Sequence, residues 1–181
     1  MTREDYFVAA LKILATEGAG KLKIGALCKS IHVTTGSFYG YFGSFDGFVA
    51  EFLEHWEALQ ERIVELSNIP DDPAERIHTM KELAYSVPQE AEAAIRAWAH
   101  THPLVAEAQK RVDERRVEAL MAIVRPACKS RTEARRLAVM GITLLIGLQQ
   151  WRSPVTRKDF NIVFDEYEAV VMARYAVNHG L

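Results

Sequence analysis

The sequence predicts an all-α protein of about nine helices, and three observations support this prediction. Apolar residues recur at i, i+3, i+4 and i+7 along most of the 181-residue chain, which is the spacing of amphipathic helices. The alternation of apolar and polar residues that marks strands appears nowhere at useful length. Capping pairs, in which serine, threonine or aspartate stands three residues before an acid, occur where apolar stripes begin. With 49% hydrophobic and 25% charged residues, the composition is that of a folded globular protein.

The amino-terminal segment predicts a first helix that starts near residue 3. Thr2 and Asp5 have capping-box spacing, so each side chain reaches a backbone amide of the first turn. The apolar stripe of this helix consists of Phe7, Ala10, Leu11 and Leu14.

Residues 23–48 predict a helix-turn-helix. Ile24, Leu27 and Ile31 form the apolar face of a short helix, and a tight turn at His32 follows. The second short helix begins with the small residues Thr34, Thr35, Gly36 and Ser37 and continues with the aromatic residues Phe38, Tyr39, Tyr41 and Phe42. Compact hydroxyl side chains at the start of a helix suit entry into a DNA major groove, while aromatic rings pack behind them.

A long helix is predicted from about Phe45, because one apolar stripe continues for six turns. The stripe consists of Phe45, Phe48, Phe52, Trp56, Leu59, Ile63 and Leu66. Residues 67–73 then form a short turn. Asp72 and Glu75, with Pro73 between them, predict a new helix that starts near residue 73.

The last part of the chain predicts two long helices, at roughly residues 131–152 and 157–178, each preceded by a capping pair. These pairs are Ser130 with Glu133 and Thr156 with Asp159. Further helix breaks are expected at Pro88, Pro103, Pro126 and Pro154. Residues 137–148 are apolar around the whole helix, so this helix must be covered on every side. A second copy of the chain, in a two-fold homodimer, is one cover; a central position in a monomeric bundle is the other.

Charge and cysteine content limit the class of protein. The net charge is −2, so a nucleic acid would have to be bound by a local patch. Residues 1–48 carry five basic and four acidic side chains. Cys28 and Cys128 are too few for a disulfide scaffold, which fits a cytoplasmic protein. We expect no export signal, and we expect no membrane span because the uncharged run at residues 137–151 is shorter than the roughly 20 residues required.

Catalytic and metal-binding patterns are not evident. Glu75 and His78 have the Glu-x-x-His spacing of di-iron bundles, but such bundles need this motif on two helices and no second copy exists. His100 and His102 lie two residues apart, on opposite sides of a helix. We therefore expect no enzyme, no metal and no cofactor.

Residues 33–42 resemble the recognition-helix signature of the tetracycline-repressor (TetR) family of bacterial transcription regulators. The resemblance is specific over residues 6–53, and the plan of three short helices, a long fourth helix and an all-α bundle extends it to the whole chain. It implies that residues 1–48 bind DNA and that residues 49–181 bind a ligand and dimerise. The residues that it implies contact DNA are Lys23, Thr34, Thr35, Gly36, Ser37, Tyr39 and Tyr41.

Within this set the resemblance implies separate roles. Thr35 and Ser37 would face bases, and Tyr39 and Tyr41 would reach phosphates through their hydroxyls. Phe38 and Phe42 are expected to pack in the core; they are aromatic residues of the same segment.

Three residues depart from the family pattern. His32 stands where the family has glycine, and histidine tolerates the left-handed conformation better than most residues do. Phe45 replaces a lysine that would contact phosphate, so DNA binding should depend less on salt. Cys28 replaces a small residue such as alanine and is expected to be buried.

The sequence therefore predicts a homodimeric transcriptional regulator that dimerises through its last two helices. It would be a repressor that binds a palindromic operator and is released by a small hydrophobic or aromatic effector. The residues expected to bind this effector are His55, Trp56, Met80, Tyr85, Trp98, Met121 and Trp151. The alternative is an all-helical ligand-binding or scaffold protein without DNA binding.

Overall fold

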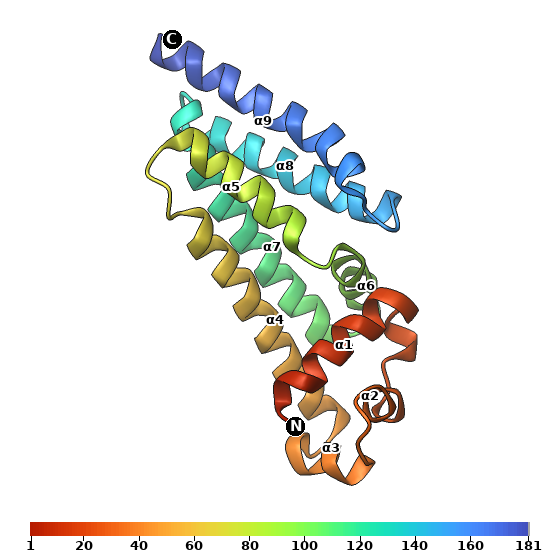
Figure 1. Ribbon diagram of the computed structural model, residues 1–181. Helices are drawn as coiled ribbons and strands as arrows, with labels where there is room; N and C mark the ends of the chain where they lie inside the picture. Colours follow the sequence, from red (N-terminus) through yellow and green to blue (C-terminus); the bar gives the residue numbers. More distant parts are fainter. Residues whose placement is uncertain (181) are drawn as a thin grey trace. The chain divides into compact units, whose positions relative to one another are not determined.

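The computed structural model describes residues 1–180, and over these residues it consists of nine α-helices and two 3₁₀ helices with no strand (Figure 1). The elements are α1 (Arg3–Glu17), η1 (Ala19–Lys21), α2 (Ile24–Ser30), α3 (Thr35–Phe42), α4 (Phe45–Ser67), α5 (Pro73–Ser86), α6 (Gln89–Ala99), α7 (Pro103–Val124), η2 (Arg125–Ala127), α8 (Arg131–Trp151) and α9 (Arg157–His179). The predicted all-α class is confirmed. No helix among these residues has the length and apolar character needed to cross a membrane.

The predicted capping pairs start the helices at the expected positions. The side chains of Thr2, Asp72, Ser130 and Thr156 each accept a hydrogen bond from the backbone N–H three residues further on. Such bonds satisfy amides that have no partner inside the helix. The helices α1, α5, α8 and α9 therefore begin at or within a residue of the predicted starts.

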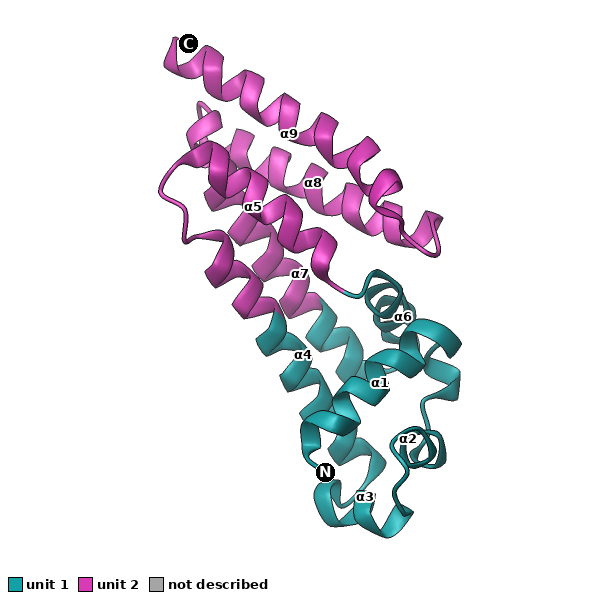
Figure 2. Ribbon diagram, in the orientation of Figure 1, with its two compact units in different colours: residues 1–59, 88–109 teal, residues 60–87, 110–181 magenta. Residues whose placement is uncertain are grey.

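The chain divides into two compact units (Figure 2). Unit 1 contains residues 1–59 and 88–109, and unit 2 contains residues 60–87 and 110–180. Unit 1 thus extends beyond residue 48, because α6 packs against α1. The division of function at residue 48 remains a prediction.

Unit 1 is built around a cluster of buried aromatic rings. The ring of Phe42 lies 5.2 Å from that of Tyr6, 5.1 Å from that of Phe38 and 5.1 Å from that of Phe48, measured between centroids. The rings of Tyr6 and Phe48 both meet Phe42 edge to face, an arrangement that aromatic pairs favour. This cluster joins α1, α3 and the first turns of α4.

Unit 2 holds a second core between α5, α7, α8 and α9. Its largest fully buried residue is Phe160, whose ring stacks on that of Phe164 at 4.3 Å. Leu137 and Leu145 of α8 are buried in the same core, but Val139 of α8 is 44% exposed. The uniformly apolar helix is therefore not covered on every side by its own chain.

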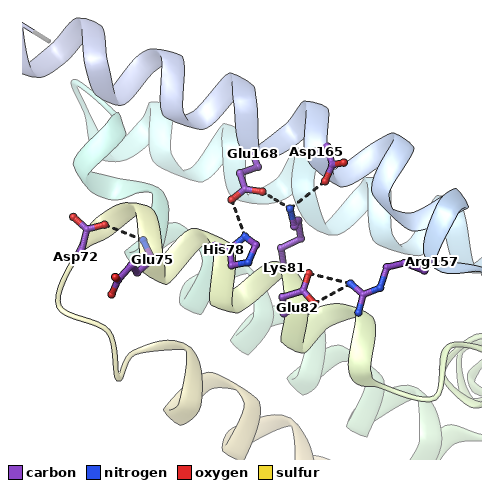
Figure 3. A network of polar contacts seen from close by, with 8 residues as sticks. All are labelled: Asp72, Glu75, His78, Lys81, Glu82, Arg157, Asp165 and Glu168. Carbon is purple, nitrogen blue, oxygen red and sulfur yellow. Dashed lines mark hydrogen bonds and ion pairs between the residues drawn. The ribbon is translucent and has the colours of Figure 1, made fainter.

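Polar contacts join α5 to α9 in unit 2 (Figure 3). The Lys81 ammonium pairs with Asp165 at 3.1 Å and also with Glu168, both of which are on α9. Burial by itself would lower the pKa of Lys81, but the two carboxylates outweigh it and raise that pKa. Arg157 forms a second connection, with both its hydrogen bonds made to Glu82.

Candidate nucleic-acid interface

The helix-turn-helix consists of α2, a turn and α3. The backbone N–H of Val33 donates to the carbonyl of Cys28 at 2.9 Å, which closes the turn. His32 has a φ of 57°, so the predicted left-handed conformation is confirmed. The Thr34 side chain caps α3 by accepting from the N–H of Ser37.

The two sides of α3 differ in exposure. Phe38 and Phe42 are 0% and 7% exposed, so the prediction that they pack in the core is confirmed. Thr35 and Gly36 are exposed, and Tyr39 is 52% exposed. The first turn of α3 therefore presents small polar groups to solvent, next to a large aromatic side chain that carries a hydroxyl.

Two other residues predicted to contact DNA are engaged within unit 1. Ser37 is half-buried, and its Oγ atom accepts a hydrogen bond from the hydroxyl of Tyr6 at 3.1 Å. Tyr41 is also half-buried, and its hydroxyl donates to the carbonyl of Met1 at 2.6 Å. Their hydroxyls are therefore held in fixed positions before any ligand binds.

Exposed lysines lie on the helix-turn-helix and in the part of the chain before it. Lys23 is exposed at the N-cap of α2. Three further lysines of residues 1–48 are also exposed, namely Lys12, Lys21 and Lys29. Backbone amides at the start of α2 and the flexible lysines provide donors of the kind that phosphates bind.

One contact to α3 was not foreseen from the sequence. The Arg3 guanidinium donates from Nη2 to the carbonyl of Tyr41 at 2.9 Å and from Nε to Glu51 at 2.8 Å. Tyr41 and Glu51 lie 38 and 48 residues away in the sequence. The spacing of neighbouring residues cannot predict a contact between residues so far apart in the sequence.

Cys28 is 3% exposed, which confirms the expected small buried residue. Burial raises the pKa of its thiol, and a protonated thiol is a weak nucleophile. Cys28 and Cys128 are both free.

Three of the seven residues predicted to bind the effector lie in unit 1. His55 stacks on Phe7 with 4.9 Å between ring centroids. Trp56 is buried, and its Nε1 atom donates to Glu92 at 2.7 Å. Trp98 is 9% exposed. All three are integrated into the packing of unit 1.

The other four lie in unit 2. Met80 lines a cavity of about 50 Å³ whose wall also includes Gly141, Phe164 and Tyr167. Met121 packs against the core, and the ring of Tyr85 meets that of Phe160 at 5.2 Å. Trp151 is 71% exposed, with the guanidinium of Arg152 over its ring at 4.0 Å. This cavity is smaller than the about 300 to 1,000 Å³ that ligand pockets usually measure.

Within residues 1–180, no group of three or more histidine, cysteine, aspartate or glutamate side chains is arranged to hold a metal ion. Glu75 and His78, the pair with Glu-x-x-His spacing, have separate partners (Figure 3). The Nδ1 atom of His78 lies 3.3 Å from Glu168 on α9. The backbone N–H of Glu75 donates to the side chain of Asp72, which caps the helix.

Neither a protein-family profile nor a curated protein sequence matches the chain. Solved structures do match it over nearly its whole length. A TetR transcriptional regulator from Legionella pneumophila has a TM-score of 0.76 and 15% identity, and the match covers 96% of each chain. A transcriptional regulator from Rhodococcus sp. Rha1 has a TM-score of 0.75 and 16% identity, over 96% of this chain and 97% of that one.

A third solved structure, from Saccharomonospora viridis, contains choline. It has a TM-score of 0.73 and 16% identity, and the match covers 98% of this chain and 95% of that one. At such low identity the likeness concerns the fold. The chain thus has the fold of TetR-family transcriptional regulators, with its helix-turn-helix in unit 1.

Proposed function

We propose that this protein is a DNA-binding transcriptional regulator whose recognition helix is α3. The observation that carries the proposal is the exposed start of α3, where Thr35, Gly36 and Tyr39 face solvent on a helix-turn-helix whose other side is buried. The fold shared with TetR-family regulators supports it. In such a motif the recognition helix lies in the major groove with its amino-terminal residues at the base edges.

The predicted contact residues then have separate roles. Thr35 and Ser37 donate to or accept from base edges, and the backbone of Gly36 allows a close approach. Tyr39 contacts a phosphate, whereas Tyr41 does so only if its hydroxyl leaves the carbonyl of Met1. Lys23 and Thr34, which stand at the N-caps of α2 and α3, contact phosphates beside them.

We propose that the protein acts as a homodimer through α8 and α9. These helices expose large apolar residues, namely Val139 and Met140 on α8 and Ile162, Val170 and Val177 on α9. Water contact with so many apolar side chains on neighbouring helices is unfavourable, and a two-fold partner removes it. The two recognition helices of a dimer would then need a separation of about 34 to 36 Å, or a multiple, to read a palindromic operator.

The regulator would be a repressor, released in the cytoplasm by a small hydrophobic or aromatic effector bound within residues 49–181. The cavity beside Met80 is apolar, and the flexible methionine side chain allows it to enlarge. The choline complex of the Saccharomonospora viridis protein is consistent with a small organic ligand in this fold. An effector that prefers one dimer geometry would change operator affinity by its differential affinity for that geometry.

Selection from random DNA duplexes tests the proposal. The wild-type protein should enrich a two-fold sequence, and Thr35→Ala and Tyr39→Ala should each bind it about tenfold or more weakly. Thr101→Ala, at an exposed threonine between α6 and α7 and outside the proposed DNA and dimer surfaces, is the matched control and should bind like the wild type. If the wild type enriches nothing, or if both α3 variants bind normally, the protein is a helical ligand-binding or scaffold protein instead.

A further inference from the structure

Two residues of α1 contact α3, one near each end of α3. At the carboxyl end, Arg3 donates to the carbonyl of Tyr41 at 2.9 Å and pairs with Glu51 of α4 at 2.8 Å. Its guanidinium also lies 5.7 Å from the ring centroid of Tyr41 and 5.9 Å from that of Phe42. Because a guanidinium is planar and rigid, these contacts fix the end of α3 relative to both neighbouring helices.

Tyr6 contacts Ser37 and Phe38 in the first half of α3. Its side chain is 0% exposed, its ring meets those of Phe38 and Phe42, and its hydroxyl donates to Oγ of Ser37 at 3.1 Å. A buried hydroxyl hydrogen needs an acceptor, and Ser37 supplies one. The hydroxyl hydrogen of Ser37 is then free to point outward, away from Tyr6.

We propose that Arg3 and Tyr6 are positioning residues that set the placement of α3 for DNA readout and orient Ser37 as a hydrogen-bond donor toward a base acceptor. The role in DNA readout rests on the proposed function, whereas the placement of α3 does not. A purine N7 or O6 atom, or a thymine O4 atom, would accept that hydrogen in the major groove.

The competing explanation is that Arg3 binds a DNA phosphate directly. Its charge is already paired with Glu51, and two of its nitrogen atoms already donate within the protein. A phosphate contact would therefore require it to leave these partners. The two explanations predict different salt dependence, since each phosphate contact changes the slope of log K against log salt by about 0.9.

The first experiment measures hydrogen exchange of the α3 amides in the full chain without DNA. Arg3→Ala and Tyr6→Phe should both increase exchange over residues 35–43. Lys12→Ala, which removes one positive charge from an exposed position on the same helix, should leave it unchanged. Unchanged exchange in Arg3→Ala and Tyr6→Phe would overturn the proposal.

The second experiment compares binding to the duplex selected by the wild type with binding to a scrambled duplex. Arg3→Ala should weaken binding to the selected duplex about three- to tenfold, as expected for a charged but partly exposed hydrogen bond. Binding to the scrambled duplex and the salt slope should stay the same. Arg3→Lys should not restore affinity, because lysine keeps the charge and loses the planar fork.

Tyr6→Phe keeps the ring and removes only the hydroxyl, so it isolates the contact with Ser37. Repeated selection with this variant should enrich a broader set of bases at the positions that the wild type reads. Selection of the same sequence at the same stringency would contradict the assigned role of Ser37.

The outcomes separate this proposal from the proposed function. A flatter salt slope in Arg3→Ala, or full rescue by Arg3→Lys, would make Arg3 a phosphate contact and overturn its positioning role. If the wild type selects no duplex, the regulator function fails and with it the role in readout. Faster exchange in the two variants would in that case still establish that α1 positions α3.

Discussion

The hydroxyl of Tyr167 on α9 donates a hydrogen bond of 2.9 Å to the carbonyl of Leu137 on α8. One turn further along α8, Gly141 lies against the same ring, and a Cβ atom there would stand 2.8 Å from the Tyr167 Cζ atom and 2.7 Å from Leu120 Cδ2. These distances are too short for real carbon contacts. The two helices approach as they do because residue 141 has no side chain.

Gly141→Ala should therefore destabilise the protein by about 1 to 2 kcal/mol, since overpacking outweighs the better helix propensity of alanine. Gly147→Ala on the same helix is the control, because no atom lies within 4 Å of the position that its new methyl group would take. That change should stabilise the protein by up to about 1 kcal/mol. Thermal unfolding at one fixed protein concentration compares the melting temperatures of the two variants. Equal changes of the same sign would show that close packing at residue 141 does not limit stability.

Tyr167 should also make the protein sensitive to alkaline pH. Burial raises the pKa of its hydroxyl in the folded protein, while the unfolded chain keeps a value of about 10. The folded state therefore holds this proton more tightly, and the resulting stability is complete below about pH 10 and is lost as the pH rises above it.

Tyr167→Phe removes this titration, as well as the bond to Leu137. The variant should be about 1 kcal/mol less stable than the wild type at pH 7. Between pH 9 and pH 11, the free energy of unfolding of the wild type should fall by about 1 kcal/mol more than that of the variant. Urea unfolding at pH 7, pH 9 and pH 11 measures both values. An equal fall in the two proteins would show that Tyr167 does not titrate in this way.

We expect Lys81 to make the largest polar contribution to the packing of α5 against α9. Its side chain is 11% exposed, and its ammonium group pairs with both Asp165 and Glu168. Lys81→Met should cost about 1 to 3 kcal/mol, because it leaves two neighbouring carboxylates without their cation. The double variant with Glu168→Gln should recover part of this loss.

The exposed pair of Arg174 and Glu133 provides the comparison for Lys81. The side chains are 43% and 31% exposed, so Arg174→Met should cost less than about 1 kcal/mol. Both variants are measured by urea unfolding at pH 7. An equal cost for Lys81→Met and Arg174→Met would mean that the contacts of Lys81 with α9 are no stronger than a surface pair.

The proposed dimer can be tested by placing charge on α9. Ile162 and Val177 are 63% and 76% exposed, and a glutamate at either position would be buried without a partner if α9 forms the interface. Ile162→Glu and Val177→Glu should convert a dimer to a monomer in sedimentation velocity. Ile69→Glu, at a 70% exposed residue outside the helices, should leave the dimer intact. A wild type that sediments as a monomer at micromolar concentration would refute this interface.

The sequence alone predicted the helices because their signals are local. The capping pairs that start α1, α5, α8 and α9, and the left-handed turn at His32, involve residues at most four positions apart. Helix periodicity likewise identified Phe38 and Phe42 as buried, since it reports which side of a helix is apolar.

The sequence by itself determined the order of the helices, the starts of α1, α4, α5, α8 and α9, and the exposed first turn of α3. The apolar stripe predicted on α4 is buried at Phe48, Phe52 and Trp56 but wrong at Leu59, which is 41% exposed. Only the tertiary structure decided which sides meet: Arg3 with Tyr41, Tyr6 with Ser37, and Lys81 with Glu168, which are 38, 31 and 87 residues apart. It also placed α6 against α1, and it distributed the predicted effector residues over both units. The physical reason is that periodicity records that a helix side avoids water, whereas its partner is selected by the shape and hydrogen bonding of side chains from distant parts of the chain.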